Sequence, residues 1–69
     1  MDQASGYVVV LQRTGDQNQR VLQHADDEPT ARAYFEGYAR DYRGKGERGE
    51  IVLRKVDTGE VIEQRQLRG

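Results

Sequence analysis

The sequence predicts a small α+β domain of the order ββαββ, in which one amphipathic helix packs on one face of a four-stranded antiparallel sheet. Three observations lead to this fold class. Residues 27–43 repeat apolar side chains at steps of three and four, as a helix lying on a core does. Two short apolar runs precede this stretch and two follow it. Each pair of runs is separated by residues typical of turns, which predicts two hairpins.

The first hairpin follows a polar stretch, residues 1–6, that we expect to be a flexible tail, so the domain spans residues 7–68. Residues 7–11 are continuously apolar and β-branched, which predicts a strand in the middle of the sheet. Turn-forming residues occupy positions 14–19. Residues 20–24 then predict a shorter and more polar return strand.

The predicted helix organises the rest of the chain. Asp26 and Asp27 are suited to cap it, Pro29 is tolerated in a first turn, and Gly44 follows the periodic stretch as a stop. At about 100° per residue, its apolar side chains share one stripe that faces the core. The stripe consists of Ala31, Tyr34, Phe35, Tyr38, Ala39 and Tyr42.

The second hairpin begins after a charged, glycine-rich connector at residues 44–49. Residues 50–56 predict the third strand. The turn Asp-Thr-Gly-Glu comes next, and we expect Gly59 in it to be left-handed. Residues 61–67 predict the last strand, whose polar centre indicates an edge position with one face in water.

The register of this second hairpin stays open. A two-residue loop would place Arg54 opposite Glu63, whereas a three-residue loop would place Arg54 opposite Ile62. The choice decides which side chains share a face of the sheet.

Composition limits the classes of function. The chain has 69 residues and no cysteine, which excludes disulfides and thiolate metal sites and fits a cytoplasmic protein. The polar start lacks the basic region and apolar run of a signal peptide, and no apolar run is long enough to cross a membrane. The net charge is −1, but residues 40–69 hold eight bases against six acids. We therefore expect no membrane association and a mildly basic second half.

Catalysis has little support in the sequence. The only histidine is His24 and the only serine is Ser5, in the predicted tail, so no nucleophile and base are brought together by spacing. The acidic residues 26–28 beside His24 offer carboxylates to a metal ion, but a helix start explains them more simply. We expect a protein that is not an enzyme and uses no metal and no cofactor.

The primary hypothesis is a small non-enzymatic protein-binding module, an inhibitor or adaptor that masks or bridges a protein partner. Glycine inside a helix costs roughly 1 kcal/mol relative to alanine, and Gly37 falls on the predicted outer face, one turn from Ala33. Either another backbone approaches this small patch, or the glycine is merely tolerated while Arg–Glu pairs support the helix. The predicted partner-binding residues are Arg32, Ala33, Glu36, Gly37 and Arg40 on the helix, with Arg54 and Arg65 on the sheet.

The alternative function is nucleic-acid binding by the basic second half. A surface with interspersed arginines is suited to follow a phosphate backbone, although acids are interleaved and the tyrosines are assigned to the core. The predicted contacts are Arg43, Lys45, Arg48, Arg54 and Lys55.

The sheet suggests a third hypothesis, a homodimer. Val8 and Val10 point to the face opposite that of Val9, and one helix covers only one face. The uncovered valine-rich face, or an open edge strand, is suited to bind a second copy. The ββαββ outline is similar to that of compact phage-type inhibitors and of DNA-binding arms of recombinases, an analogy of fold that assigns no function.

Overall fold

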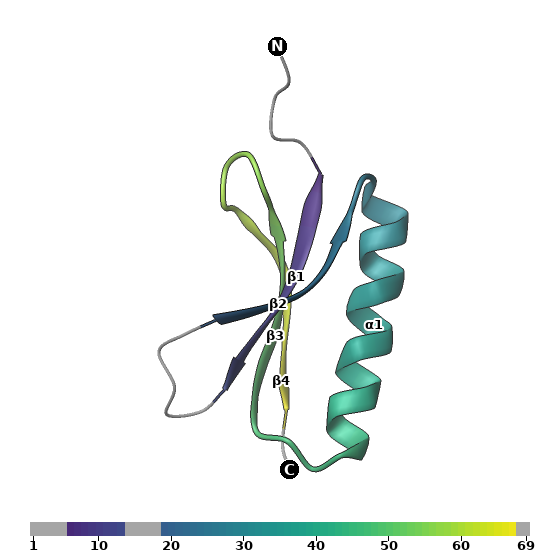
Figure 1. Cartoon of the computed structure of the whole chain (residues 1–69), viewed down its shortest axis with the longest axis vertical. Helices are drawn as coiled ribbons and strands as arrows, with labels where there is room; N and C mark the ends of the chain where they lie inside the picture. The colour runs from purple at the N-terminus through teal and green to yellow at the C-terminus, as the bar shows by residue number, and fades with distance from the viewer. Residues whose placement is uncertain (1–5, 14–18, 68–69) are drawn as a thin grey trace.

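The computed structural model describes residues 6–13 and 19–67 and has the element order ββαββ, which confirms the predicted fold class (Figure 1). Residues 1–5 of the predicted tail, most of the first turn and residue 68 lie outside the described residues. The elements are β1 (Tyr7–Arg13), β2 (Gln19–Ala25), α1 (Glu28–Gly44), β3 (Gly49–Lys55) and β4 (Val61–Leu67).

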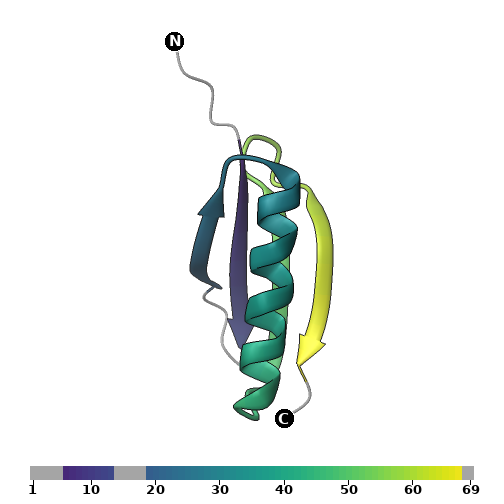
Figure 2. The same ribbon diagram turned by 90° about the vertical axis from the view of Figure 1, so that its right-hand side faces the viewer.

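The four strands form one antiparallel sheet in the order β2-β1-β3-β4. Strand β1 is therefore central and β4 is an edge strand, both as predicted. Helix α1 runs along the sheet on one face (Figures 1 and 2). No described helix or strand lies over the other face, which we call the open face.

The core fills the space between α1 and the sheet. Side chains alternate between the two faces along the central strands. Val9 and Leu11 of β1, and their partner positions Leu53 and Ile51 of β3, therefore point towards the helix. Phe35 is almost fully buried at the centre of the helix stripe, and small alanines one turn before and after it allow α1 to approach the sheet closely. The buried core consists of Val9, Leu11, Ala31, Phe35, Ala39, Ile51, Leu53 and Leu67.

The predicted helix stripe is too wide by one residue. Tyr34 is 38% exposed and does not belong to the core, so its assignment to the stripe was wrong. Tyr34 precedes Phe35 and points about 100° away from it, beyond the margin that the sheet covers. Tyr38, four residues later, is half-buried, and its hydroxyl donates to the Leu22 carbonyl of β2 at 3.3 Å.

The ends of α1 differ slightly from the prediction. Asp27 is the N-cap, and its carboxylate accepts from the Thr30 N–H at 3.3 Å, as predicted. Gly44 does not stop the helix but forms its last residue, and Lys45 is the C-cap in a right-handed conformation. The left-handed glycine lies two residues further on, since Gly46 has a φ of +74°.

The second hairpin follows neither of the two registers left open by the sequence. The Lys55 N–H donates to the Glu60 carbonyl at 2.8 Å, so the loop has four residues. A bulge in β4 then sets Arg54 opposite Val61 and leaves Ile62 packed against the core. Gly59 has a φ of +75°, which confirms the predicted left-handed turn residue.

The start of β3 depends on a second glycine with positive φ. Gly49 has a φ of +147°, and a Cβ built on it would lie 2.9 Å from the Arg13 Cα atom and would overlap the Gln12 carbonyl oxygen. The connector from α1 therefore enters the sheet through a position that only glycine fills without displacing β1.

Candidate interaction surfaces

One side of the outer helix surface, the side next to β4, is occupied by ion pairs within the chain. The Arg65 guanidinium of β4 donates to both carboxylate oxygens of Glu36, at 2.6 and 3.0 Å. Arg32 donates to Glu28 at 2.9 Å and lies 3.5 Å from the Glu63 carboxylate of β4. These contacts tie the helix to the edge strand across the margin of the core.

The hydrogen bonds from Arg65 hold the pKa of the Glu36 carboxyl below its ordinary range, and the same bonds raise the pKa of the Arg65 guanidinium. The guanidinium carbon of Arg65 also lies 5.4 Å from the centre of the Phe35 ring. Three of the predicted partner-binding residues, Arg32, Glu36 and Arg65, thus have a structural explanation inside the chain. They remain at the surface, but their charges are already paired.

The other side of the helix surface has a shallow depression with a volume of about 230 Å³. We call it the Gly37 groove, and it is lined by Ala33, Tyr34, Gly37, Tyr38 and Asp41. A Cβ built on Gly37 meets nothing within 4 Å, so the described part of the chain gives no packing reason for this glycine. Ala33, Tyr34 and Gly37 are all exposed.

Sequence reasoning found only part of this groove. Ala33 and Gly37 were predicted to be exposed, and they are. Tyr34 and Tyr38 were assigned to the core, and Asp41 was assigned to no site. Tyr34 lies three residues before Gly37, Tyr38 directly after it and Asp41 four residues after it. On a helix, side chains at these spacings surround one point of the surface.

The predicted nucleic-acid contacts do not form one surface. Arg43, Lys45 and Arg48 lie at the C-terminal end of α1 and in the connector, whereas Arg54 and Lys55 lie at the far end of β3. Arg54 and Lys55 are also consecutive residues of one strand, so they point to opposite faces of the sheet.

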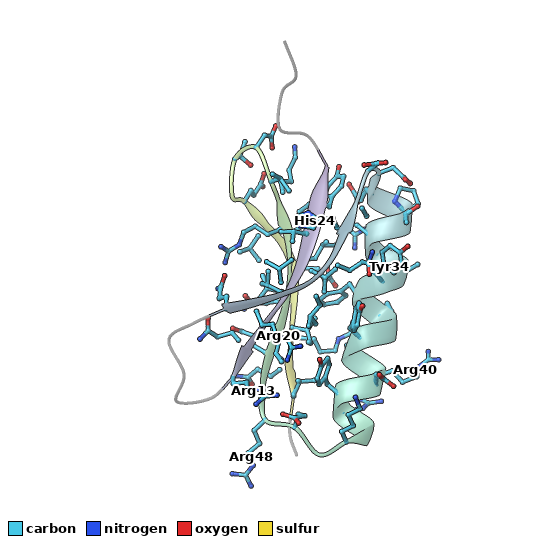
Figure 3. All side chains as sticks on the ribbon, in the orientation of Figure 1. Arg13, Arg20, His24, Tyr34, Arg40 and Arg48 are labelled. Atoms are coloured by element: carbon cyan, nitrogen blue, oxygen red, sulfur yellow. The ribbon has the colours of Figure 1, made fainter. Side chains whose placement is uncertain are left out.

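The basic residues near the end of the helix are largely exposed. Figure 3 shows Arg40 extending from α1 away from the sheet, and Arg48 extending from the connector beyond the end of the helix. Lys45 lies 3.9 Å from the Asp41 carboxylate and over the Tyr42 ring. A pocket of about 100 Å³ between α1 and β4 is lined by Arg40 and Arg43 together with the Glu36–Arg65 pair.

The open face carries Arg54. Its partner positions on the neighbouring strands are Val8 of β1 and Val61 of β4. The Arg54 Nε atom is buried and has no hydrogen-bond partner within the described part of the chain.

Three further observations concern metal binding, the histidine and the membrane. Within residues 6–13 and 19–67, no three or more histidine, cysteine or acidic side chains gather closely enough to hold a metal ion. His24 is exposed on β2, opposite Val8. The described helix lacks the length and apolar character needed to cross a membrane.

Comparison of the chain with protein-family models, with curated proteins and with solved structures found no match.

Proposed function

We propose that the protein is a small non-enzymatic protein-binding module that holds a partner protein against the outer surface of α1 and so masks or bridges it. The Gly37 groove is the observation that supports this most. A glycine in the interior of a helix costs about 1 kcal/mol relative to alanine. Because nothing in the described chain packs on Gly37, packing within the chain does not explain the glycine, whereas close approach of a partner backbone would.

The chemistry of the groove fits an apolar segment of a protein. The Tyr34 and Tyr38 side chains offer rigid apolar surface with hydroxyl groups at their ends, which is a composition enriched at protein interfaces. Between them, the missing side chain of Gly37 lets a partner backbone approach the helix closely. Asp41 closes one end of the groove with a charge, and Arg40 is exposed beside it as part of a polar rim.

The ion pairs beside β4 support this use indirectly. The core around Phe35 packs the helix on the sheet and the Glu36–Arg65 pair adds a contact at its margin, so the groove lies on an ordered helix rather than on a loop. A preordered surface loses less conformational entropy when a partner binds. In this proposal, Arg32, Glu36 and Arg65 position the helix, and Ala33, Gly37 and their tyrosine neighbours contact the partner.

The test compares two identical substitutions on the same helix. Gly37→Arg fills the groove, whereas Gly44→Arg adds the same side chain to the last helical residue, where a Cβ also meets no described atom within 4 Å. Tagged wild-type protein and both variants are used to capture proteins from a lysate of the source cells. We expect a protein that is captured by the wild type and by Gly44→Arg but not by Gly37→Arg. Equal capture by both variants would reject the groove.

The alternative function, nucleic-acid binding, rests on Arg43 and Arg48, for which the structure shows no ion pair with a described residue. Fluorescence anisotropy of labelled DNA and RNA at low and near-physiological salt tests it. Binding that weakens with salt and is lost after Arg43→Glu and Arg48→Glu would favour this function. In that case Gly37→Arg would leave the affinity unchanged.

A further inference from the structure

The open face of the sheet has an apolar centre of its own. Val10 of β1 and Val52 of β3 are partner positions on neighbouring strands and are only 4% and 3% exposed, yet neither belongs to the core under the helix. On the edge strands, Val21 is paired with Val10 and is 53% exposed, and Val61 is 44% exposed. Valines thus line up from β2 to β3 on the side away from α1, whereas on β4 the position opposite Val52 is Gln64 and Val61 lies opposite Arg54.

Two opposite charges flank this centre symmetrically. Glu50 and Arg54 lie on β3, two residues before and two residues after Val52, so both point to the open face. Neither has an ion pair within the described part of the chain, and the Arg54 Nε atom is buried without a hydrogen-bond partner. A half-buried arginine in this state is stabilised when a carboxylate reaches it.

We propose that the open face binds the open face of a second copy of the chain, with Arg54 of each copy paired to Glu50 of the other. A two-fold axis that lies between the sheets, perpendicular to the strands and level with Val10 and Val52, reverses the direction of β3. It therefore brings Glu50 of one copy over Arg54 of the other. One operation makes two equal ion pairs around a valine centre, which is the self-complementarity that a two-fold interface requires.

The geometry of packed sheets allows these pairs. Each charged residue lies about 6.6 Å from the axis along its strand. A crossing angle of about 30° between the strands of the two sheets therefore moves it by only a few ångströms from the position directly over its partner. Facing sheets lie about 10 Å apart, a gap that a glutamate and an arginine span together.

The size of the face predicts a weak dimer. Four strands of seven residues cover roughly 19 by 23 Å, which is less than the roughly 800 Å² per partner of a standard interface. The central valines are already shielded from water. The exposed valines at the edges and the two ion pairs therefore provide most of the favourable free energy of dimerisation. We expect association in the micromolar range or weaker, and further weakening by salt.

Charge exchange tests this arrangement. In a dimer of Arg54→Glu, the new glutamate of each copy would face Glu50 of the other. In a dimer of Glu50→Arg, the new arginine of each copy would face Arg54 of the other. Each variant alone should therefore be monomeric. Mixed together, the two variants should form a heterodimer. The acid introduced at position 54 of one copy then faces the base introduced at position 50 of the other, and the unchanged Glu50 and Arg54 face each other. The measurement is sedimentation equilibrium of the full chain at several concentrations in about 0.15 M salt, with circular dichroism to verify that each variant is folded.

The matched control mixes Glu50→Arg with Arg40→Glu, which has the same net charge as Arg54→Glu but carries the change on the outer side of the helix. The proposal predicts a dimer for the wild type and for Arg40→Glu alone, and at least a tenfold weaker dimer for each single variant at the open face. Glu50→Arg should form a heterodimer of wild-type strength only when it is mixed with Arg54→Glu. A wild-type monomer at all concentrations would overturn it. So would a dimer that the two substitutions do not weaken, since another surface would then hold the copies together.

Discussion

Gly37→Ala is the substitution for which the structure gives the clearest energetic prediction. Gly37 lies in the interior of α1, does not have a positive φ, and a Cβ added there meets nothing within 4 Å among residues 6–13 and 19–67. The methyl group therefore causes no clash and gains no packing. Only the difference in helix propensity between glycine and alanine changes the free energy of unfolding. That change stabilises the protein by about 1 kcal/mol. For a domain of this size, the midpoint of thermal unfolding should rise by about 4–8 °C.

The assay is thermal and urea unfolding followed by circular dichroism, with two control variants. Gly44→Ala makes the same change at the last helical residue and should have a smaller effect, because helix ends fray. Gly59→Ala forces a side chain into a left-handed conformation and should destabilise the protein by about 1 kcal/mol. If Gly37→Ala lowers the midpoint while the helix content is unchanged, the glycine is needed for the fold, and the argument that reserves it for a partner fails.

Three further predictions concern the fold. Phe35→Ala should cost about 3–5 kcal/mol, because a nearly fully buried ring is removed, and circular dichroism should then show a largely unfolded chain at 25 °C. Gly49→Ala should destabilise by about 1–3 kcal/mol through its positive φ and its contact with β1, measured as a lower urea midpoint with unchanged slope. The Glu36 carboxyl has a pKa below its ordinary range when folded, so its stabilising effect should be present above the unfolded pKa of about 4.3 and lost as pH falls through the folded pKa. Urea midpoints should therefore fall less between pH 5 and pH 2 in Glu36→Gln than in the wild type, and an identical pH dependence would refute the role of Arg65.

The fold could be predicted from the sequence because its signals are local. The periodicity of residues 27–43 gave the helix, and the apolar run at residues 7–11 gave the central strand. Capping by Asp27 and the left-handed Gly59 followed from short-range chemistry of single residues. Each of these features depends on neighbours within about four positions along the chain.

The errors arose where distant parts of the chain meet. The second hairpin has a four-residue loop and a bulge, and no local signal at Arg54 or Ile62 distinguishes this register from its alternatives. Tyr34 has the right spacing for the core, but the width of the sheet decides which helix residues are covered. Likewise, Glu36 is paired with Arg65, twenty-nine positions away, a contact that depends on the strand order.

The two proposed surfaces are compatible because they lie on opposite sides of the sheet. Helix α1 lies on one side of the sheet (Figure 1). The Gly37 groove is on this helix, whereas Glu50 and Arg54 belong to the open face on the other side. A dimer joined through the open faces would present two outward helices. Such an assembly is suited to bridge two copies of a partner, which is the adaptor form of the proposed function.

Photo-crosslinking from the Gly37 groove shows directly whether a partner protein lies against the outer surface of α1. A photoreactive amino acid replaces Ala33, which lines the groove, or Arg20, an exposed residue of β2 used as the control position. We expect a crosslinked partner protein from position 33 that disappears when Gly37→Arg is added and is absent from position 20. No crosslink from position 33, or the same products from both positions, would contradict it.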